Sequence, residues 1–335
     1  MIGSQTSTLH PLRFEPIFKQ LIWGGRKLAT VLSKPIGEGS QYAESWEISD
    51  HRSDVSRVAE GPLVGQTLRD LADRHGEALF GRAVGPRDQF PLLIKFIDAQ
   101  QDLSVQVHPD DALGKILVDD NGKTETWVII DAEPGSKIYA GLKAGVTRDD
   151  MARAIDEGTV ETLIHSFPAK AGDCIFIPAG TIHAIGAGVV LAEVQQMSDA
   201  TFRVHDWGRV GADGKPRQLH LGEALQAIDF AAGPVSPMAT VAEPISGGTR
   251  EMLSRSPYFA LERLELSGPA TIGDPDRFTI VLGLGGEAEI RSDHGVTAVG
   301  LGQTVLLPAA IGVCRVEPRD QATLLTCVVP PSLLR

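Results

Sequence analysis

The sequence predicts a mainly β protein in which strands close into β-barrel domains and helices are few and short. Most of the chain consists of short apolar or alternating runs separated by turns, in keeping with its 36 Gly and 21 Pro in 335 residues. Apolar residues at helical spacing occur in few places. In addition, the segment from Gly172 to His183 joins an apolar strand to a tight turn and then a histidine, which is typical of a metal site at the mouth of a barrel.

Three segments have the spacing of a helix. The segment from Thr67 to Phe80 predicts one helix, and that from Leu221 to Phe230 predicts another. The segment from Thr147 to Ile164 predicts one or two short helices around Gly158, with Arg148 and the two aspartates after it capping the first turn.

Two domains are expected, because 335 residues exceed what one hydrophobic core usually supports. The Pro/Gly/Ser-rich passage from Ala231 to Pro237 predicts the boundary, which gives domains over residues 1–235 and 236–335. The second domain repeats the Gly-x5-Pro spacing of the first at Gly302 to Pro308, but Val313 stands at the position of His183. We therefore expect a second barrel of similar construction that binds no metal.

Composition excludes several classes of protein. The net charge of −12 argues against partners that are nucleic acids or anionic membranes, and no apolar run approaches the roughly 18 residues of a membrane span. Residues 1–12 lack the basic-then-apolar layout of a signal peptide, and three cysteines are too few for a disulfide framework. We expect a cytoplasmic protein with buried thiols.

The segment from Gly172 to His183 needs partner ligands to be a metal site. Upstream, Ser104, Gln106 and His108 alternate along a strand and so share one face, and Glu125 opens the next strand. Each of these residues alone has a plain structural explanation. Together, Gln106, His108, Glu125 and His183 form a mixed nitrogen and oxygen set that suits a divalent ion such as zinc.

These motifs resemble the two half-motifs of the cupin barrel, with Gln106 where many cupins have histidine. The flanking segments Pro91–Lys95, Trp23–Gly25, Glu44–Ser49 and Glu193–Arg203 are similar to those of type I mannose-6-phosphate isomerases, in their short bacterial form. The resemblance covers residues 12 to about 210. It implies two cupin-like jelly-roll β-barrel domains, of which one is active and the other is degenerate.

The resemblance also implies an activity, the interconversion of mannose 6-phosphate and fructose 6-phosphate through an enediol. It implies one Zn²⁺ per chain at the four ligands, although a site with one carboxylate suits Fe, Mn, Co or Ni equally. Arg203, Glu193 and Lys123 are the implied catalytic residues, while Lys95 and Ser104 are the implied phosphate contacts. Lys95, Lys123 and Arg203 would make the pocket locally positive, as an anionic substrate requires in an acidic protein.

Some points remain open at this stage. Glu193 is either the general base or a buried structural carboxylate, and Arg203 either neutralises the enediolate or grips the phosphate. Departures from the family pattern are Gly122, Ile185 and Met197, so histidine and tyrosine side chains found in longer members are absent here. Alternative functions are another metal cupin, such as an iron dioxygenase, and a non-enzymatic sugar-binding cupin. The expected partner is a small sugar phosphate, and the expected state is a monomer or a weak homo-oligomer.

Overall fold

The computed structural model describes residues 9–52, 54–85, 87–211 and 214–331. Residues 1–8, which belong to the segment that lacks the layout of a signal peptide, lie outside the described residues. The chain forms two compact units. The central unit comprises Phe18–Trp46 and Leu92–Met238, and the terminal unit comprises the segment up to Ile17, Glu47–Pro91 and the chain from Ala239 onward.

This division differs from the predicted one at residues 235 and 236. The carboxyl-terminal boundary lies only a few residues away, between Met238 and Ala239, but two early segments pack with the carboxyl-terminal part. Leu12 exchanges backbone hydrogen bonds with Leu306, and Phe80 packs against Phe278. Contacts between residues so distant in the chain produce no pattern in the local sequence. A division into two contiguous domains was therefore the simplest prediction.

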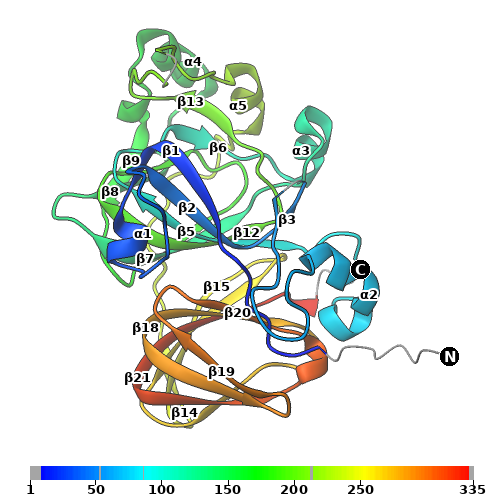
Figure 1. Cartoon of the computed structure of the whole chain (residues 1–335). Helices are drawn as coiled ribbons and strands as arrows, with labels where there is room; N and C mark the ends of the chain where they lie inside the picture. Colours follow the sequence, from blue (N-terminus) through cyan, green and yellow to red (C-terminus); the bar gives the residue numbers. More distant parts are fainter. Residues whose placement is uncertain (1–8, 53, 86, 212–213, 332–335) are drawn as a thin grey trace. The chain divides into compact units, whose positions relative to one another are not determined.

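The central unit contains two β-sheets, and the prediction of a mainly β protein is confirmed (Figure 1). The first sheet has the order β1-β2-β5-β12-β7-β10, with bounds Ile17–Gly25, Tyr42–Ile48, Leu92–Ala99, Val189–Gln196, Glu125–Ala132 and Cys174–Ile177. The second sheet has the order β13-β6-β11-β8-β9, with bounds Phe202–His205, Val105–Val107, His183–Ile185, Lys137–Leu142 and Ile164–Pro168.

Apolar side chains of the two sheets meet in one buried cluster. Ile129 and Leu191 come from the first sheet, and Ile138 and Ile185 from the second. The opposite face of the second sheet forms another cluster with helices α4 and α5, which Figure 1 shows beside β13. Because successive side chains of a strand alternate between faces, the second sheet has one face toward the first sheet and one toward the helices.

The predicted helices are confirmed, with shorter bounds. The predicted helix at Thr67–Phe80 is α2 (Leu68–Phe80), which Thr67 caps and Gly76 kinks. The segment at 147–164 forms α4 (Arg148–Glu157) and the 3₁₀ turn η1 (Val160–Leu163), but the capping residue is Thr147, in a capping box with Asp150. Helix α5 covers Leu221–Ala227. Two helices were not predicted, α1 (Lys27–Thr30) and α3 (Asp111–Val118).

The terminal unit is built on an 8-stranded sheet with the order β14-β15-β16-β21-β18-β19, to which β17 and β20 pair at β21 and β18. The bounds are Ala242–Ile245, Gly248–Arg255, Ala260–Leu266, Cys314–Val328, Thr279–Ser292 and Gly295–Gly300, with β17 at Ala270–Ile272 and β20 at Thr304–Leu307. The unit also contains α2, the pair β3 (Asp50–His51) and β4 (Asp54–Val55), and the turn η2 (Ala309–Ile311). Its core includes Leu264, Val281 and Leu324.

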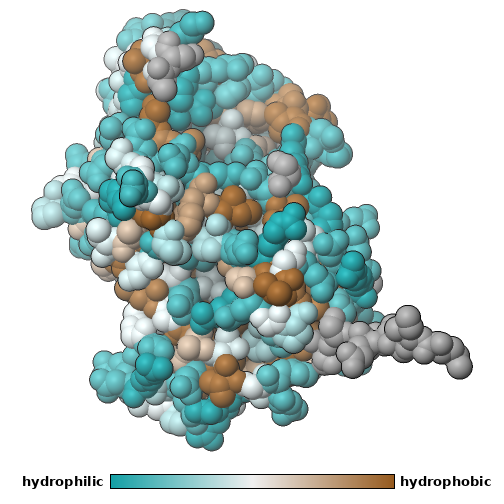
Figure 2. All heavy atoms as spheres, in the orientation of Figure 1, coloured by the Kyte–Doolittle hydropathy of each residue, from teal (hydrophilic) through white to brown (hydrophobic). Residues whose placement is uncertain are grey.

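Most exposed apolar side chains stand singly on a hydrophilic surface, as the small separate brown patches of Figure 2 show. One such patch lies over α3, where Ile116 and Val118 are exposed. Among the described residues, no helix has the length and apolar character needed to cross a membrane. Cys174, Cys314 and Cys327 are buried thiols, as expected.

Candidate metal and substrate site

The inward faces of both sheets change from apolar to polar toward one end of the central unit. In the first sheet, the strand register aligns Lys95, Glu193 and Trp127 across β5, β12 and β7. Glu125 lies two residues before Trp127 and therefore on the same face. All four of these side chains are buried. The first sheet thus presents one row of functional groups.

The second sheet presents a matching row. Arg203, Gln106 and His183 are aligned across β13, β6 and β11. The predicted turn produces this alignment, because Gly180 adopts a φ of 88° and its N–H donates to the carbonyl of His108 at 2.9 Å. That bond ties the end of β6 to the turn before β11, so the two histidines lie side by side with ring centroids 4.8 Å apart.

His108, Glu125 and His183 form a buried cluster in which one ligand atom of each lies within 4.8 Å of the others. The Nε2 atom of His108 is 3.5 Å from Oε2 of Glu125, and that of His183 is 3.4 Å from Oε1. Three of the four predicted ligands therefore converge on one point from β7, β11 and the end of β6.

Hydrogen bonds fix the direction of both imidazole lone pairs. Nδ1 of His108 lies 2.8 Å from the carbonyl of Ala200, and Nδ1 of His183 lies 2.9 Å from that of Thr181. A carbonyl only accepts, so each Nδ1 carries the proton and each Nε2 is left as an acceptor within the cluster. Oε1 of Glu125 is buried and has no hydrogen-bond partner among the described residues. Converging acceptors with an orphaned carboxylate oxygen fit a bound cation.

Gln106 and Lys123 complete the surroundings of this cluster. The amide nitrogen of Gln106 is 3.3 Å from Nε2 of His183, so a half-turn of the amide is needed before its oxygen faces the cluster. Nζ of Lys123 donates to Nε2 of His108 at 3.0 Å and to Glu125. The lysine therefore supplies one positive charge to this set of acceptors.

Burial and neighbouring charges shift the titration of the cluster. Burial, with a contribution from the charge of Lys123, lowers the pKa of His108 below its usual value. Burial lowers the pKa of His183 to about 3. Although burial opposes it, the ammonium of Lys123 and the two histidines hold the pKa of Glu125 well below its usual value. At neutral pH the cluster is therefore two neutral imidazoles and one carboxylate, which is the protonation state that binds a metal.

A second buried network holds Glu193. Its Oε1 is 3.3 Å from Nζ of Lys95, which is also 3.5 Å from a carboxylate oxygen of Glu44. Its Oε2 accepts from Nε1 of Trp127 at 2.8 Å. Burial opposes the charge on Lys95, but the carboxylates of Glu44 and Glu193 outweigh burial and raise its pKa. The cation beside Glu193 is thus Lys95.

Arginines gather at the other row. Nε of Arg203 donates to Oγ of Ser104 at 3.2 Å. Arg209 and Arg217 both bind the carboxylate of Asp206, with Nε of Arg217 at 2.7 Å. Burial, together with the charges of Arg217 and Arg209, lowers the pKa of Arg203. The sequence did not predict Arg217 or Trp127 as site residues, and it indicated Glu44 only as part of a family-like segment, because their contacts involve partners distant in the chain.

Several of the side chains described above, among them Lys95, Gln106 and Arg203, line one cavity of about 310 Å³ in the central unit. Its cations and carboxylates include Lys95, Lys123, Arg203 and Arg217 against Glu44, Glu193 and Asp199. Four cations against three carboxylates leave the lining positive, although the whole chain carries −12. The cavity can therefore hold a small anion, with the predicted ligand Gln106 and the carboxylate of Glu193 both in its lining.

Comparisons with known proteins agree with this site. The family model "Phosphomannose isomerase type I, catalytic domain" matches residues 12–126. The mannose-6-phosphate isomerase ManA of Bacillus subtilis is 36% identical over 315 residues, which cover 92% of this chain and 96% of the relative. The mannose-6-phosphate isomerase of Streptococcus mutans is 33% identical over 302 residues, covering 89% and 93%.

The structures agree as well. The crystal structure of the mannose 6-phosphate isomerase from Bacillus subtilis superposes with a TM-score of 0.87 and 31% identity, over 95% of this chain and 99% of that one. The similarity therefore extends beyond the segment from residue 12 to 210 that carries the motifs. The chain belongs to the type I mannose-6-phosphate isomerase family.

Proposed function

We propose that this chain interconverts mannose 6-phosphate and fructose 6-phosphate through an enediol, with one Zn²⁺ bound per chain. The observation that carries the proposal is the pair of facing rows, in which His108, Glu125 and His183 form a buried acceptor cluster beside a positive cavity. Gln106 is the proposed fourth ligand, after its amide turns. The names of the relatives agree with this reaction.

The metal has one proposed task. When bound, it acts as a Lewis acid that stabilises the negative charge developing on the sugar oxygens, and it does so without redox chemistry. A set with one carboxylate and three neutral ligands leaves the ion a net positive charge, which favours that task. Buried imidazoles with low pKa values keep the ligands ready at neutral pH.

The side chains have proposed roles of their own. Glu193 takes the proton from C2 and returns it at C1; among the described residues its buried Oε1 makes an ion pair with Lys95 but no hydrogen bond, while Trp127 fixes Oε2. Lys123, beside the cation site, is proposed to assist transfer between the hydroxyl oxygens. Arg203 stabilises the enediolate, and Ser104 and Lys95 contact the phosphate, with the positive lining attracting it.

The finer architecture and setting are also proposals. Each unit is proposed to be a cupin-like jelly-roll barrel, and the second one is proposed to bind no metal. In support, the cluster at His183 is the only group of metal-binding side chains found among the described residues, and Val313 at the corresponding turn is exposed. We further propose a cytoplasmic monomer or weak homo-oligomer without nucleic-acid or membrane partners, in line with the charge of −12.

The test is a coupled assay with mannose 6-phosphate under anaerobic conditions. Chelation of the wild type should abolish turnover, and zinc should restore it. His183→Ala should lose both bound metal, measured by mass spectrometry, and turnover, whereas His294→Ala, which changes an exposed histidine, should keep both. Turnover that survives chelation would contradict the proposal. Turnover that requires oxygen would favour the dioxygenase alternative, and binding without turnover would favour the sugar-binding one.

A further inference from the structure

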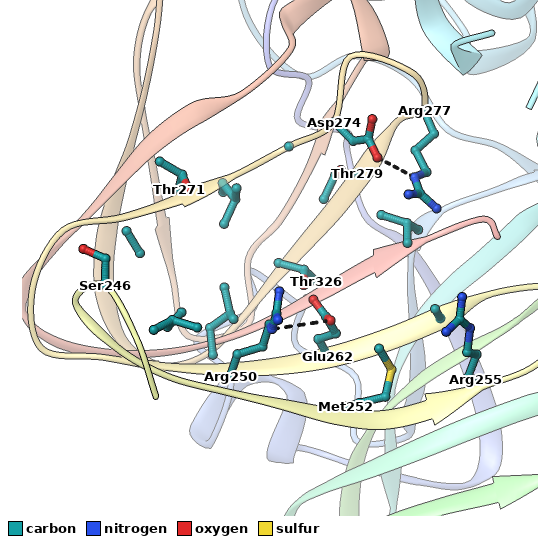
Figure 3. Close-up of a pocket in the computed structure, with 17 residues that line it drawn as sticks. Ser246, Arg250, Met252, Arg255, Glu262, Thr271, Asp274, Arg277, Thr279 and Thr326 are labelled. Carbon is teal, nitrogen blue, oxygen red and sulfur yellow. Dashed lines mark hydrogen bonds and ion pairs between the residues drawn. The ribbon is translucent and has the colours of Figure 1, made fainter. Parts of the chain in front are cut away.

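The terminal unit contains a cavity that isomerisation does not use. Its volume is about 460 Å³, compared with about 310 Å³ for the cavity of the central unit. We call it the C-terminal pocket; it is lined by residues of β15, β16, β17, β18 and β21 and by the loop from Gly273 to Arg277 (Figure 3). Its size is that of a small-molecule site.

Polar side chains occupy inward positions in this pocket. Ala260, Glu262 and Leu264 alternate along β16, and Leu264 belongs to the buried core of the unit. Glu262 therefore shares the core-facing side of the sheet. The register places Thr326 of β21 beside Glu262. A carboxylate and a hydroxyl at positions that could have been apolar cost stability, so their presence points to a role other than packing.

The pocket has two charged walls, which Figure 3 shows facing one another. On one wall, Nε of Arg277 binds Asp274 at 2.6 Å. On the other, Arg250 forms two long ion pairs, with Nε 3.8 Å from Glu262 and Nη2 3.8 Å from Glu243, and both distances are too long for a hydrogen bond. The guanidinium of Arg255, also in the lining, makes neither a hydrogen bond nor an ion pair with the described part of the chain. Three guanidinium groups thus face two carboxylates, and two of the three retain free donors.

A buried hydroxyl supplies an independent observation. Thr279, at the start of β18, is 3% exposed and lines the pocket. Its Oγ1 has no hydrogen-bond partner among the described residues. An unsatisfied buried hydroxyl costs about 1–3 kcal/mol. A ligand hydroxyl in the pocket would satisfy it.

We propose that the C-terminal pocket binds a small organic anion that carries several hydroxyl groups, such as a phosphorylated sugar or a sugar acid. Arg250 and Arg255 bind the anionic group, because their donors are free and the lining has one excess positive charge. Thr279, Thr326 and Glu262 bind hydroxyls of the ligand. This is a second ligand site, remote in sequence from the isomerase residues, and it stands whether or not the proposed reaction is correct.

Methionine methyl NMR can test this site in the full chain. Met252 lines the C-terminal pocket and is partly exposed, so its methyl group reports on binding there. Met238, which is exposed and lines neither this pocket nor the central cavity, is the control. We expect 6-phosphogluconate at millimolar concentration to shift the Met252 signal saturably and to leave Met238 unchanged. Absence of a saturable Met252 shift with 6-phosphogluconate, and with gluconate in its place, would overturn the proposal.

Variants make the test specific. The double variant Arg250→Gln, Arg255→Gln should weaken binding at Met252 by about tenfold or more, whereas Arg315→Gln, an exposed arginine of β21 outside the pocket, should not. Thr279→Val should weaken binding without lowering the thermal midpoint, because it removes an unsatisfied hydroxyl. Equal binding by the wild type and the double variant would overturn the role of the arginines.

Three further probes separate the sources of the anion. Gluconate tests the carboxylate, inorganic phosphate tests the phosphate without hydroxyls, and sorbitol tests the hydroxyls without charge. Stronger binding of 6-phosphogluconate than of inorganic phosphate and sorbitol supports an anion with hydroxyls. If gluconate binds more tightly than 6-phosphogluconate, the preferred ligand is a sugar acid. Equal binding of inorganic phosphate and 6-phosphogluconate would refute hydroxyl recognition.

Discussion

Removal of the metal should make the stability of this protein fall as the solution is acidified below neutrality. The cause is the buried pair of ligand histidines, and His183 above all, whose pKa falls from 6.5 in the unfolded chain to about 3 in the folded chain. An imidazole whose pKa is lower in the folded chain binds a proton more readily in the unfolded chain, so acid favours unfolding. Stability is therefore highest above pH 6.5 and declines as the pH falls from there toward 3.

The size of the effect follows from linkage. Between about pH 7 and pH 5 the unfolded imidazole becomes protonated while the folded one stays neutral, so His183 alone removes about 2 kcal/mol of unfolding free energy. His108, whose pKa is also lowered, adds to the decline. Glu125 has the opposite sign of charge, and its depressed pKa removes stability only below about pH 4.5, outside this window.

Urea unfolding of chelated protein at several pH values measures this decline. The matched variant His183→Gln lacks the buried imidazole and keeps a polar side chain of similar size. Its unfolding free energy should change by about 2 kcal/mol less than that of the wild type across the same window. If the unfolding free energies of the two proteins change in parallel with pH, the His183 imidazole has the same pKa in the folded and unfolded chain. That result would contradict a buried, neutral His183.

Three other predictions concern single side chains. Lys95→Met should lower the unfolding free energy by about 3–5 kcal/mol because it removes the cation that the carboxylates of Glu44 and Glu193 share, while Lys115→Met on the surface should change urea stability by less than about 0.5 kcal/mol. Arg203→Ala should reduce kcat by about a hundredfold with metal content retained; loss of the metal would make Arg203 structural. Thr147→Ala should cost about 1 kcal/mol in urea unfolding through the lost cap of α4, and no change would mean that the capping box with Asp150 contributes nothing.

The cluster of His108, Glu125 and His183 was predictable because its geometry follows from strand alternation and from one local turn. Strand alternation places Ser104, Gln106 and His108 on one face, and the Pro178-x-Gly180 turn sets where the chain leaves β10. The sequence could not show which way the amide of Gln106 points, since that depends on its contact with His183. The same holds for Lys123, whose position between two ligands results from the packing of facing sheets.

Other features depend on long-range packing. The segment from Pro109 to Lys123 is largely polar, yet it contains α3, which Asp110 caps and Asp119 ends in a left-handed conformation. This helix is short and its apolar side chains are largely exposed, so the sequence shows no apolar helical face there. The C-terminal pocket was equally hidden, because Glu262 and Thr326 become neighbours only through the pairing of β16 with β21.

The discontinuous units have a consequence for synthesis of the protein on the ribosome. The chain passes between units four times, at residues 17, 46, 91 and 238. The segment 47–91, with α2, leaves the ribosome early, yet the strands on which it packs are made last. The central unit can complete its fold once Met238 has emerged, while α2 must wait with its apolar face exposed. Nascent chains of this family are therefore expected to need chaperone protection at α2 rather than at the metal site.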